Sequence, residues 1–126
     1  MPDPGDVVVL NFPGAVRVKR RPAVVFSTTL YHAHRPDVIV GLLTTNVQAA
    51  TAPTDYVLLD WAKAGLRKAT AFRSFLVTVN RAGSVHVGRL SDRDWQGIQA
   101  CLARAMACPA PLGPAAATMP PSPPTP

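Results

Sequence analysis

Short apolar runs separated by turn residues are the main pattern along the chain. The runs are rich in Val, Leu, Ile and Phe, and Pro, Gly, Asn or Asp interrupts them every few residues. Such runs are typical of β-strands, because β-branched and aromatic side chains pack well on a pleated sheet. We predict six strands, at residues 7–12, 22–27, 37–45, 55–59, 72–80 and 84–89.

Polar segments connect these strands. Residues 28–36 are predicted to form an exposed loop that contains His32 and His34. Further along, Asp60 can cap one helical turn at residues 61–64, which Gly65 would end in a left-handed conformation.

One amphipathic helix is predicted after the last strand. Ser91 and Asp94 have the spacing of a capping box, so the helix should begin at Ser91. Leu90 and Trp95 have the spacing of a hydrophobic staple across the same helix start. Four apolar side chains share one helical face, which we expect to pack on the core: Trp95, Ile98, Leu102 and Met106.

The order of elements indicates the fold class. Many short strands and one terminal helix predict a mainly β protein with some α, a small and strongly bent antiparallel sheet or barrel. The 126 residues fit one domain. From Pro109 onward the chain is rich in proline and has no charge. We therefore predict a folded domain at residues 1–107 and a disordered, Pro-rich tail at residues 108–126.

The charge of the chain is strongly positive. Thirteen Lys and Arg residues against seven acids give a net charge of +6. Five of these cations, and no acid, lie between Val7 and Pro36. A surface of one sign favours a polyanion, with nucleic acid first and an anionic membrane or an acidic protein as the alternatives.

The sequence lacks the usual patterns for a metal or a cofactor. Only His32 and His34 are close-spaced histidines, and there is no Glu and no His-x3-His pattern, so we expect no zinc site. Cys101 and Cys108 fall on the predicted helix, where packing is their ordinary role. The start of the chain lacks the features of a signal peptide. No apolar run approaches the ~20 residues that span a bilayer. We expect a cytoplasmic protein without a cofactor and without a membrane partner.

An arginine and a threonine are the best candidates for chemistry. Pro22 holds Arg21 in an extended conformation at the start of one strand, and Thr44 lies at the end of the next. In an antiparallel pair these two positions meet at one edge of the sheet. A guanidinium beside a hydroxyl suits a phosphate that gains charge during a reaction. RNA carries its own nucleophile, the 2′-hydroxyl, so its cleavage needs no metal.

An ordered set of motifs resembles the PemK/MazF family of toxins from bacterial toxin–antitoxin pairs. The motifs are Gly5-Asp6-Val7-Val8, Arg21-Pro22-Ala23-Val24-Val25, Leu43-Thr44-Thr45, Gly65-Leu66-Arg67-Lys68, Phe72-Arg73 and Gly88-Arg89-Leu90-Ser91. The resemblance covers about residues 5–107 and implies an SH3-like barrel with a C-terminal helix, in a homodimer. It also implies a metal-independent, sequence-specific endoribonuclease that leaves 2′,3′-cyclic phosphate and 5′-hydroxyl ends. A cognate antitoxin would lie over the RNA groove, and the positive charge favours an acidic one.

The resemblance also assigns roles to residues. It implies that Arg21 and Thr44 are catalytic. Other residues are expected to bind RNA: Lys19, Arg20, Thr45, Arg67 and Arg73. Some members carry an aspartate two residues beyond the position of Arg73, thought to be the base, and here that residue is Phe75. His32 or His34 has the best ordinary pKa for a base, although exposed loop histidines are commonly just solvated.

Three functions remain open at this point. The first is an endoribonuclease toxin that inhibits growth. The second is a toxin-fold protein that binds RNA or an antitoxin without cutting, because Phe75 cannot accept a proton. The third is a poison of a protein target such as DNA gyrase, which in this superfamily depends on the C-terminal helix.

Overall fold

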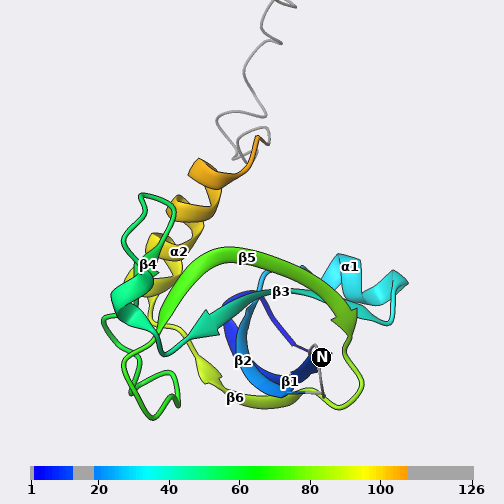
Figure 1. Cartoon of the computed structure of the whole chain (residues 1–126). Helices are drawn as coiled ribbons and strands as arrows, with labels where there is room; N and C mark the ends of the chain where they lie inside the picture. The colour runs from blue at the N-terminus through cyan, green and yellow to red at the C-terminus, as the bar shows by residue number, and fades with distance from the viewer. Residues whose placement is uncertain (1, 13–18, 108–126) are drawn as a thin grey trace, which may run out of the picture.

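Six strands form one antiparallel sheet that curls on itself into a half-barrel (Figure 1). The computed structural model describes residues 2–12 and 19–107, so the predicted tail and Cys108 lie outside the described residues. The strands are β1 (Asp6–Phe12), β2 (Lys19–Val25), β3 (Asp37–Thr44), β4 (Tyr56–Val57), β5 (Ala71–Asn80) and β6 (Val85–Arg89). Their order across the sheet is β4-β5-β3-β2-β1-β6, which confirms the predicted fold class.

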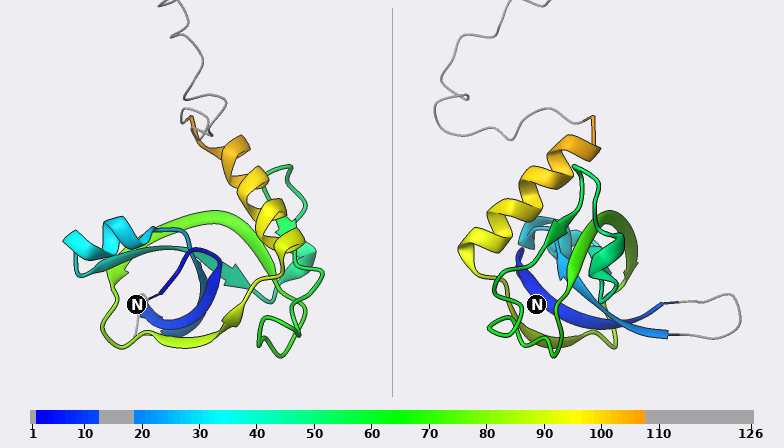
Figure 2. Two further views of the ribbon diagram at one scale, coloured as in Figure 1. Left: turned by 180° about the vertical axis from the view of Figure 1, so that it is seen from behind. Right: turned by 60° about the vertical axis from the view of Figure 1, so that its left-hand side comes forward.

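Two helices and one short 3₁₀ turn complete the described chain. They are α1 (Thr29–His34), η1 (Val47–Ala49) and α2 (Asp92–Ala105). The helices lie at opposite ends of the curled sheet (Figures 1 and 2). The predicted loop at residues 28–36 is wrong, because α1 occupies its centre. A six-residue helix shows too few turns for a hydrophobic period, and its cap, Thr28 Oγ1 accepting from Tyr31 N, is its main sequence signal.

The second strand begins earlier than predicted. Lys19, Arg20 and Arg21 were expected to precede the strand, yet they pair with Phe12, Asn11 and Leu10 of β1, respectively. The right-hand view of Figure 2 shows β1 and β2 running together out of the curled sheet. Because hydrogen bonding to β1 compensates for the low strand propensity of the cations, the hairpin carries them into regular strand geometry.

The core consists of two apolar clusters on opposite faces of the sheet. The helix-side cluster contains Val7, Val24, Leu43, Leu58, Ala64, Phe72, Leu90 and Ile98. The groove-side cluster contains Val8, Leu10, Phe12, Ala23, Val25, Val38 and Val40. Successive strand residues point to opposite faces, so strands with both faces buried read as continuous apolar runs. This explains why β1, β2 and β3 are the clearest strands in the sequence.

Helix α2 covers the helix-side cluster largely as predicted. Ser91 is its N-cap, with its Oγ accepting a hydrogen bond from Asp94 N at 3.3 Å. Ile98 is fully buried, and Trp95 and Leu102 pack beside it. The prediction for Met106 is wrong: the helix ends at Ala105, and Met106 is 41% exposed.

A buried carboxylate joins the start of α2 to the segment after β4. The Asp94 side chain accepts hydrogen bonds from the Tyr56 hydroxyl at 2.7 Å, Leu59 N at 3.0 Å and Asp60 N at 2.8 Å. Burial, together with the hydrogen bond from the Tyr56 hydroxyl to Asp94, raises the pKa of Tyr56 to about 12. Asp60 itself accepts two hydrogen bonds from Arg93 and one from Ser91, which hold the pKa of the Asp60 carboxyl well below its usual range. The helix is therefore positioned by a connected polar network as well as by its apolar face.

Candidate functional site

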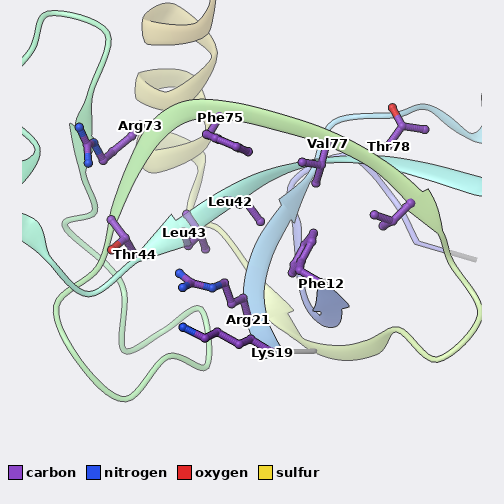
Figure 3. Close-up of a pocket in the computed structure, with 11 residues that line it drawn as sticks. Phe12, Lys19, Arg21, Leu42, Leu43, Thr44, Arg73, Phe75, Val77 and Thr78 are labelled. Atoms are coloured by element: carbon purple, nitrogen blue, oxygen red, sulfur yellow. The ribbon is translucent and has the colours of Figure 1, made fainter. Parts of the chain in front are cut away.

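A groove of about 870 Å³ lies against β2, β3 and β5 (Figure 3). Its lining combines cations, hydroxyls and an apolar floor: Lys19, Arg21 and Arg73; Thr44 and Thr78; Phe12, Leu42, Leu43, Phe75, Val77 and Val79. A smaller hollow of about 590 Å³ adjoins it along Lys19–Pro22 and Leu43–Thr45. Neither contains an acidic residue among those that line it. The charges of the groove are therefore suited to an anionic ligand.

Arg21 and Thr44 lie at the same edge of the sheet. The pairing of Ala23 with Leu42 in antiparallel β2 and β3 brings the start of one strand beside the end of the other. Both residues line the groove and the adjoining hollow. Thr44 Oγ1 accepts a hydrogen bond from Asn46 N at 3.1 Å, which orients the hydroxyl. Within the described residues the Arg21 guanidinium has no hydrogen-bond or ion-pair partner, so its donors are available to a ligand.

The pairing of β2 separates the three cations that are consecutive in the sequence. Alternation along the strand places Lys19 and Arg21 on one face, where both line the main groove. Arg20 points from the opposite face, donates to Asn11 Oδ1 at 3.0 Å and borders only the smaller hollow. Thr45 borders that hollow as well. Arg67 is exposed in the segment between β4 and β5 and lines neither site.

An irregular segment of β5 brings Arg73 to the groove. The pairing with β3 shifts between Gly41–Leu76 and Leu43–Phe72, which leaves extra residues on β5. At this bulge Ser74 has φ of +58°, and its hydroxyl donates to Thr54 O at 2.8 Å. A non-glycine residue with positive φ is uncommon outside such features.

The charge of Arg73 is partly balanced by an acid from another segment. Its Nε lies 4.0 Å from Asp55 Oδ1, and the Asp55 side chain is only 5% exposed. Arg73 is half exposed and reaches the groove beside this acid. No local pattern in the sequence connects Asp55 with Arg73.

Phe75 lines the groove as well, a role beyond the absence of an acid at this position. It lies two residues beyond Arg73, and its side chain is 59% exposed within the groove. The signal for it is the alternation of β5, in which the partly buried Val77 and Val79 lie on the same face and pack against the groove-side cluster. Phe75 continues this apolar row into the groove.

The two histidines lie far from Arg21. His32 was expected in an exposed loop, yet it is buried in α1, with Nε2 2.6 Å from Ser27 Oγ. Ser27 lies six residues beyond Arg21, just after β2 ends at Val25, and six residues of extended chain span up to about 20 Å. His34 is exposed on the same helix, and neither histidine lines the groove. The geometry therefore does not support a histidine base, because these side chains follow the opposite end of β2.

His32 should make folding stability depend on pH. Burial, with the charge of Arg81, lowers the pKa of His32 from 6.5. Below pH 6.5 the unfolded chain then binds more protons at His32 than the folded chain does. The free energy of unfolding should therefore be unaffected by His32 above this pH and should fall as the pH drops below it. Urea midpoints at several pH values should show this loss in the wild type, and His32→Gln should reduce it. An equal reduction in the control His34→Ala would contradict the assignment.

Neither a metal-binding group nor a membrane-spanning helix is found in the described part of the chain. Within residues 2–12 and 19–107, no three His, Cys, Asp or Glu side chains come together in a group that could hold a metal ion. The helices of this same part of the chain are too short or too polar to cross a membrane.

Comparisons with known proteins connect this arrangement to a family. The family described as "PemK-like, MazF-like toxin of type II toxin-antitoxin system" matches residues 3–106. No curated protein sequence matches the chain. Among solved structures, an endoribonuclease from a mycobacterial species, in complex with its cognate antitoxin, has 20% identity and a TM-score of 0.70, over 88% of this chain and 100% of that chain.

Two other solved structures have the same fold. A MazE–MazF structure from Deinococcus radiodurans gives 17% identity and a TM-score of 0.68, over 82% of this chain and 94% of that chain. Mycobacterium tuberculosis toxin MazF-mt6 gives 17% identity and a TM-score of 0.66, over 79% and 94% of the two chains. Together with the match over residues 3–106, the curled sheet and its cationic groove show that this chain belongs to the PemK-like, MazF-like toxins of type II toxin–antitoxin systems.

Proposed function

We propose that the chain is a metal-independent endoribonuclease that cuts single-stranded messenger RNA at specific sequences and thereby inhibits growth. The observation that carries this proposal is the position of Arg21 beside Thr44 in a cationic groove with no acid in its lining. Endoribonuclease activity is general in the family, which supports the same function here.

The proposed reaction is transesterification within the RNA. The 2′-oxygen attacks the adjacent phosphorus, the bond from phosphorus to the 5′-oxygen breaks, and the products are a 2′,3′-cyclic phosphate and a 5′-hydroxyl. Arg21 stabilises the negative charge that develops on the phosphate oxygens, donates a proton to the leaving 5′-oxygen and afterwards regains one from water. Thr44 holds a phosphate oxygen in place through its hydroxyl. Both effects are largest when the donors are already oriented before the reaction.

The proton of the 2′-hydroxyl needs an acceptor. None of the groove-lining residues is a carboxylate or an imidazole, and residues 13–18 contain no Asp, Glu or His. We therefore propose that this proton passes to water. In this arrangement, transition-state stabilisation by Arg21 and Thr44 provides most of the rate enhancement.

The test is cleavage of RNA in the presence of EDTA. Purified protein should produce fragments whose ends are 2′,3′-cyclic phosphate and 5′-hydroxyl, identified by enzymatic end-labelling and mass spectrometry. Thr44→Ala protein, purified in the same way, should produce far fewer fragments, which controls for contaminating nucleases. RNA that stays intact at micromolar protein would contradict the proposal.

A protein that binds RNA without cutting it is the second candidate. Phe75 favours it, because a phenyl ring occupies the position where some family members carry an acid. This function predicts RNA binding that weakens steeply with salt, without cleavage and without growth arrest on expression. Growth arrest that depends on Thr44 would exclude it.

The same groove is the proposed docking site for an antitoxin. The mycobacterial endoribonuclease was solved with its cognate antitoxin, and MazF of Deinococcus radiodurans with MazE. We propose that this chain, as a homodimer in the cytoplasm, binds an acidic antitoxin segment over Lys19, Arg21 and Arg73. These three cations line the groove, and Arg73 alone of the three has an acid nearby, Asp55, which is not part of the lining. Residues 1–107 would form the toxin domain, and the Pro-rich residues 108–126 a separate tail.

A further inference from the structure

Phe75 is an exposed aromatic side chain in the groove. Six large apolar side chains of the described residues are strongly exposed: Leu30, Val57, Leu59, Phe75, Val85 and Met106. Phe75, at 59% exposure, is the only aromatic residue among these six and the only one that lines the groove. Scattered exposed aliphatic residues are ordinary on a protein surface, whereas an exposed ring in a groove that also carries cations is a candidate contact for a ligand.

The backbone around Phe75 holds the ring in this position. Phe75 lies in the β5 bulge, next to Ser74 with its φ of +58°. The Ser74 hydroxyl is bonded to Thr54 O, which ties the bulge to a neighbouring segment. On the other side, Val77 packs on the groove-side cluster. Because the backbone is held on both sides of Phe75, the position of the residue is largely set before a ligand binds, which lowers the cost of ordering it.

Phe75 and its neighbours include groups that suit both the base and the phosphate of a nucleotide. Figure 3 shows Phe75 on β5, on the other side of the groove from Arg21 and Lys19 on β2, with Arg73 next to it along the strand. Guanidinium and ammonium groups bind phosphates, and aromatic faces stack on bases. A groove with cations on one wall and a ring on the other can therefore hold the backbone and one base of the same strand.

We propose that Phe75 stacks on one base of the bound RNA, next to the phosphate that Arg21 and Thr44 hold. The inference rests on the proposed function in that RNA is taken as the ligand. A base is favoured over an apolar anchor of a peptide, because Phe75 stands exposed on the wall instead of lining an enclosed pocket. A planar base covers an open ring face well, whereas an aliphatic side chain requires surrounding walls. At the position where some family members carry an acid, this chain would therefore contact an RNA base instead of accepting a proton.

The test measures RNA binding separately from cleavage. The cut site is mapped first from cleavage products, or by crosslinking if the protein binds without cutting. A fluorescent RNA of this sequence carries a 2′-O-methyl group at the scissile nucleotide, so anisotropy reports binding alone. The variants are Phe75→Leu, which keeps an apolar side chain, and Phe75→Trp, which keeps an aromatic ring. The matched control is Leu30→Ala, at a 71% exposed apolar residue on α1 outside the groove.

Loss of the ring should weaken binding about 5- to 100-fold in Phe75→Leu, whereas Phe75→Trp and Leu30→Ala should bind within about twofold of the wild type. An abasic residue beside the scissile phosphate should weaken wild-type binding by a similar factor and have little added effect in Phe75→Leu. This loss of additivity at one nucleotide identifies the stacked base.

Three results would overturn the inference. The first is equal RNA binding by wild type and Phe75→Leu. The second is an abasic effect that is the same in both proteins at every nucleotide. The third is weaker binding of the antitoxin, with RNA binding unchanged, which would make Phe75 a protein anchor. Wild-type protein that binds RNA without cutting it would overturn only the proposed function, so the two failures are distinguishable.

Discussion

Arg21→Ala should lower the rate of RNA cleavage at saturating RNA by about 10²- to 10³-fold, the usual loss when one donor to a developing anion is removed. Arg21 has no partner among the described residues and lies beside Thr44, so its charge is available to the phosphate. The effect falls on kcat because the charge to be stabilised is greatest in the transition state. Single-turnover cleavage of a labelled RNA in EDTA measures it directly.

Arg20→Ala is the matched control for this variant. It removes the same charge from the adjacent residue, which points from the opposite face and is bonded to Asn11. We expect RNA binding to weaken modestly and the rate at saturating RNA to stay near that of wild type. Arg21→Lys keeps the charge but loses the planar pair of donors, so it should fall between wild type and Arg21→Ala. Equal rates for Arg20→Ala and Arg21→Ala would mean that only total charge matters.

Asp94→Ala should lower the free energy of unfolding by about 3 to 5 kcal/mol, which is a large part of the stability of a domain this size. The Asp94 carboxylate is fully buried and accepts from Tyr56, Leu59 and Asp60. Truncation would leave these three donors without an acceptor at a part-buried site, in addition to the loss of the bonds themselves. Urea denaturation followed by circular dichroism measures the change.

Asp92→Ala provides the control for Asp94→Ala. Asp92 lies in the same first turn of α2 but is exposed, so its removal should cost less than about 1 kcal/mol through the helix dipole. Asp94→Asn keeps the shape and one acceptor oxygen, and should fall between the two. A loss below about 1 kcal/mol for Asp94→Ala would show that water replaces the carboxylate.

The sequence predicted the regular parts of the fold because their signals are local. Runs with both faces buried, such as Val7–Leu10 and Ala23–Val25, are apolar throughout, and the cap at Ser91 depends on residues within one helical turn. α1 was not predictable in this way. Its burial of His32 depends on Ser27 and on packing against β3, and these contacts arise only when the chain folds.

The candidate site was predictable in outline. Arg21 and Thr44 followed from strand order, because antiparallel pairing brings a strand start beside a strand end. That Arg20 and Arg21 point to opposite faces of the sheet was not predictable, because no signal in the sequence showed that β2 begins at Lys19. The bulge at Ser74 and the approach of Asp55 to Arg73 depend on the register between β3 and β5, to which no local pattern in either strand pointed.

Residues of β2 point alternately to the two faces of the sheet, so the packing of the core also determines which arginine faces the groove. Val24 belongs to the helix-side cluster, and Ala23 and Val25 to the groove-side cluster, so the core fixes which residues of the strand face each way. A slip of one residue that placed Arg20 in the groove would also turn Val24 out of its cluster. A one-residue slip of β2 that moved Arg21 out of the groove would therefore also disrupt the packing of the core. Correct folding of the core and the direction of Arg21 are therefore kept or lost together.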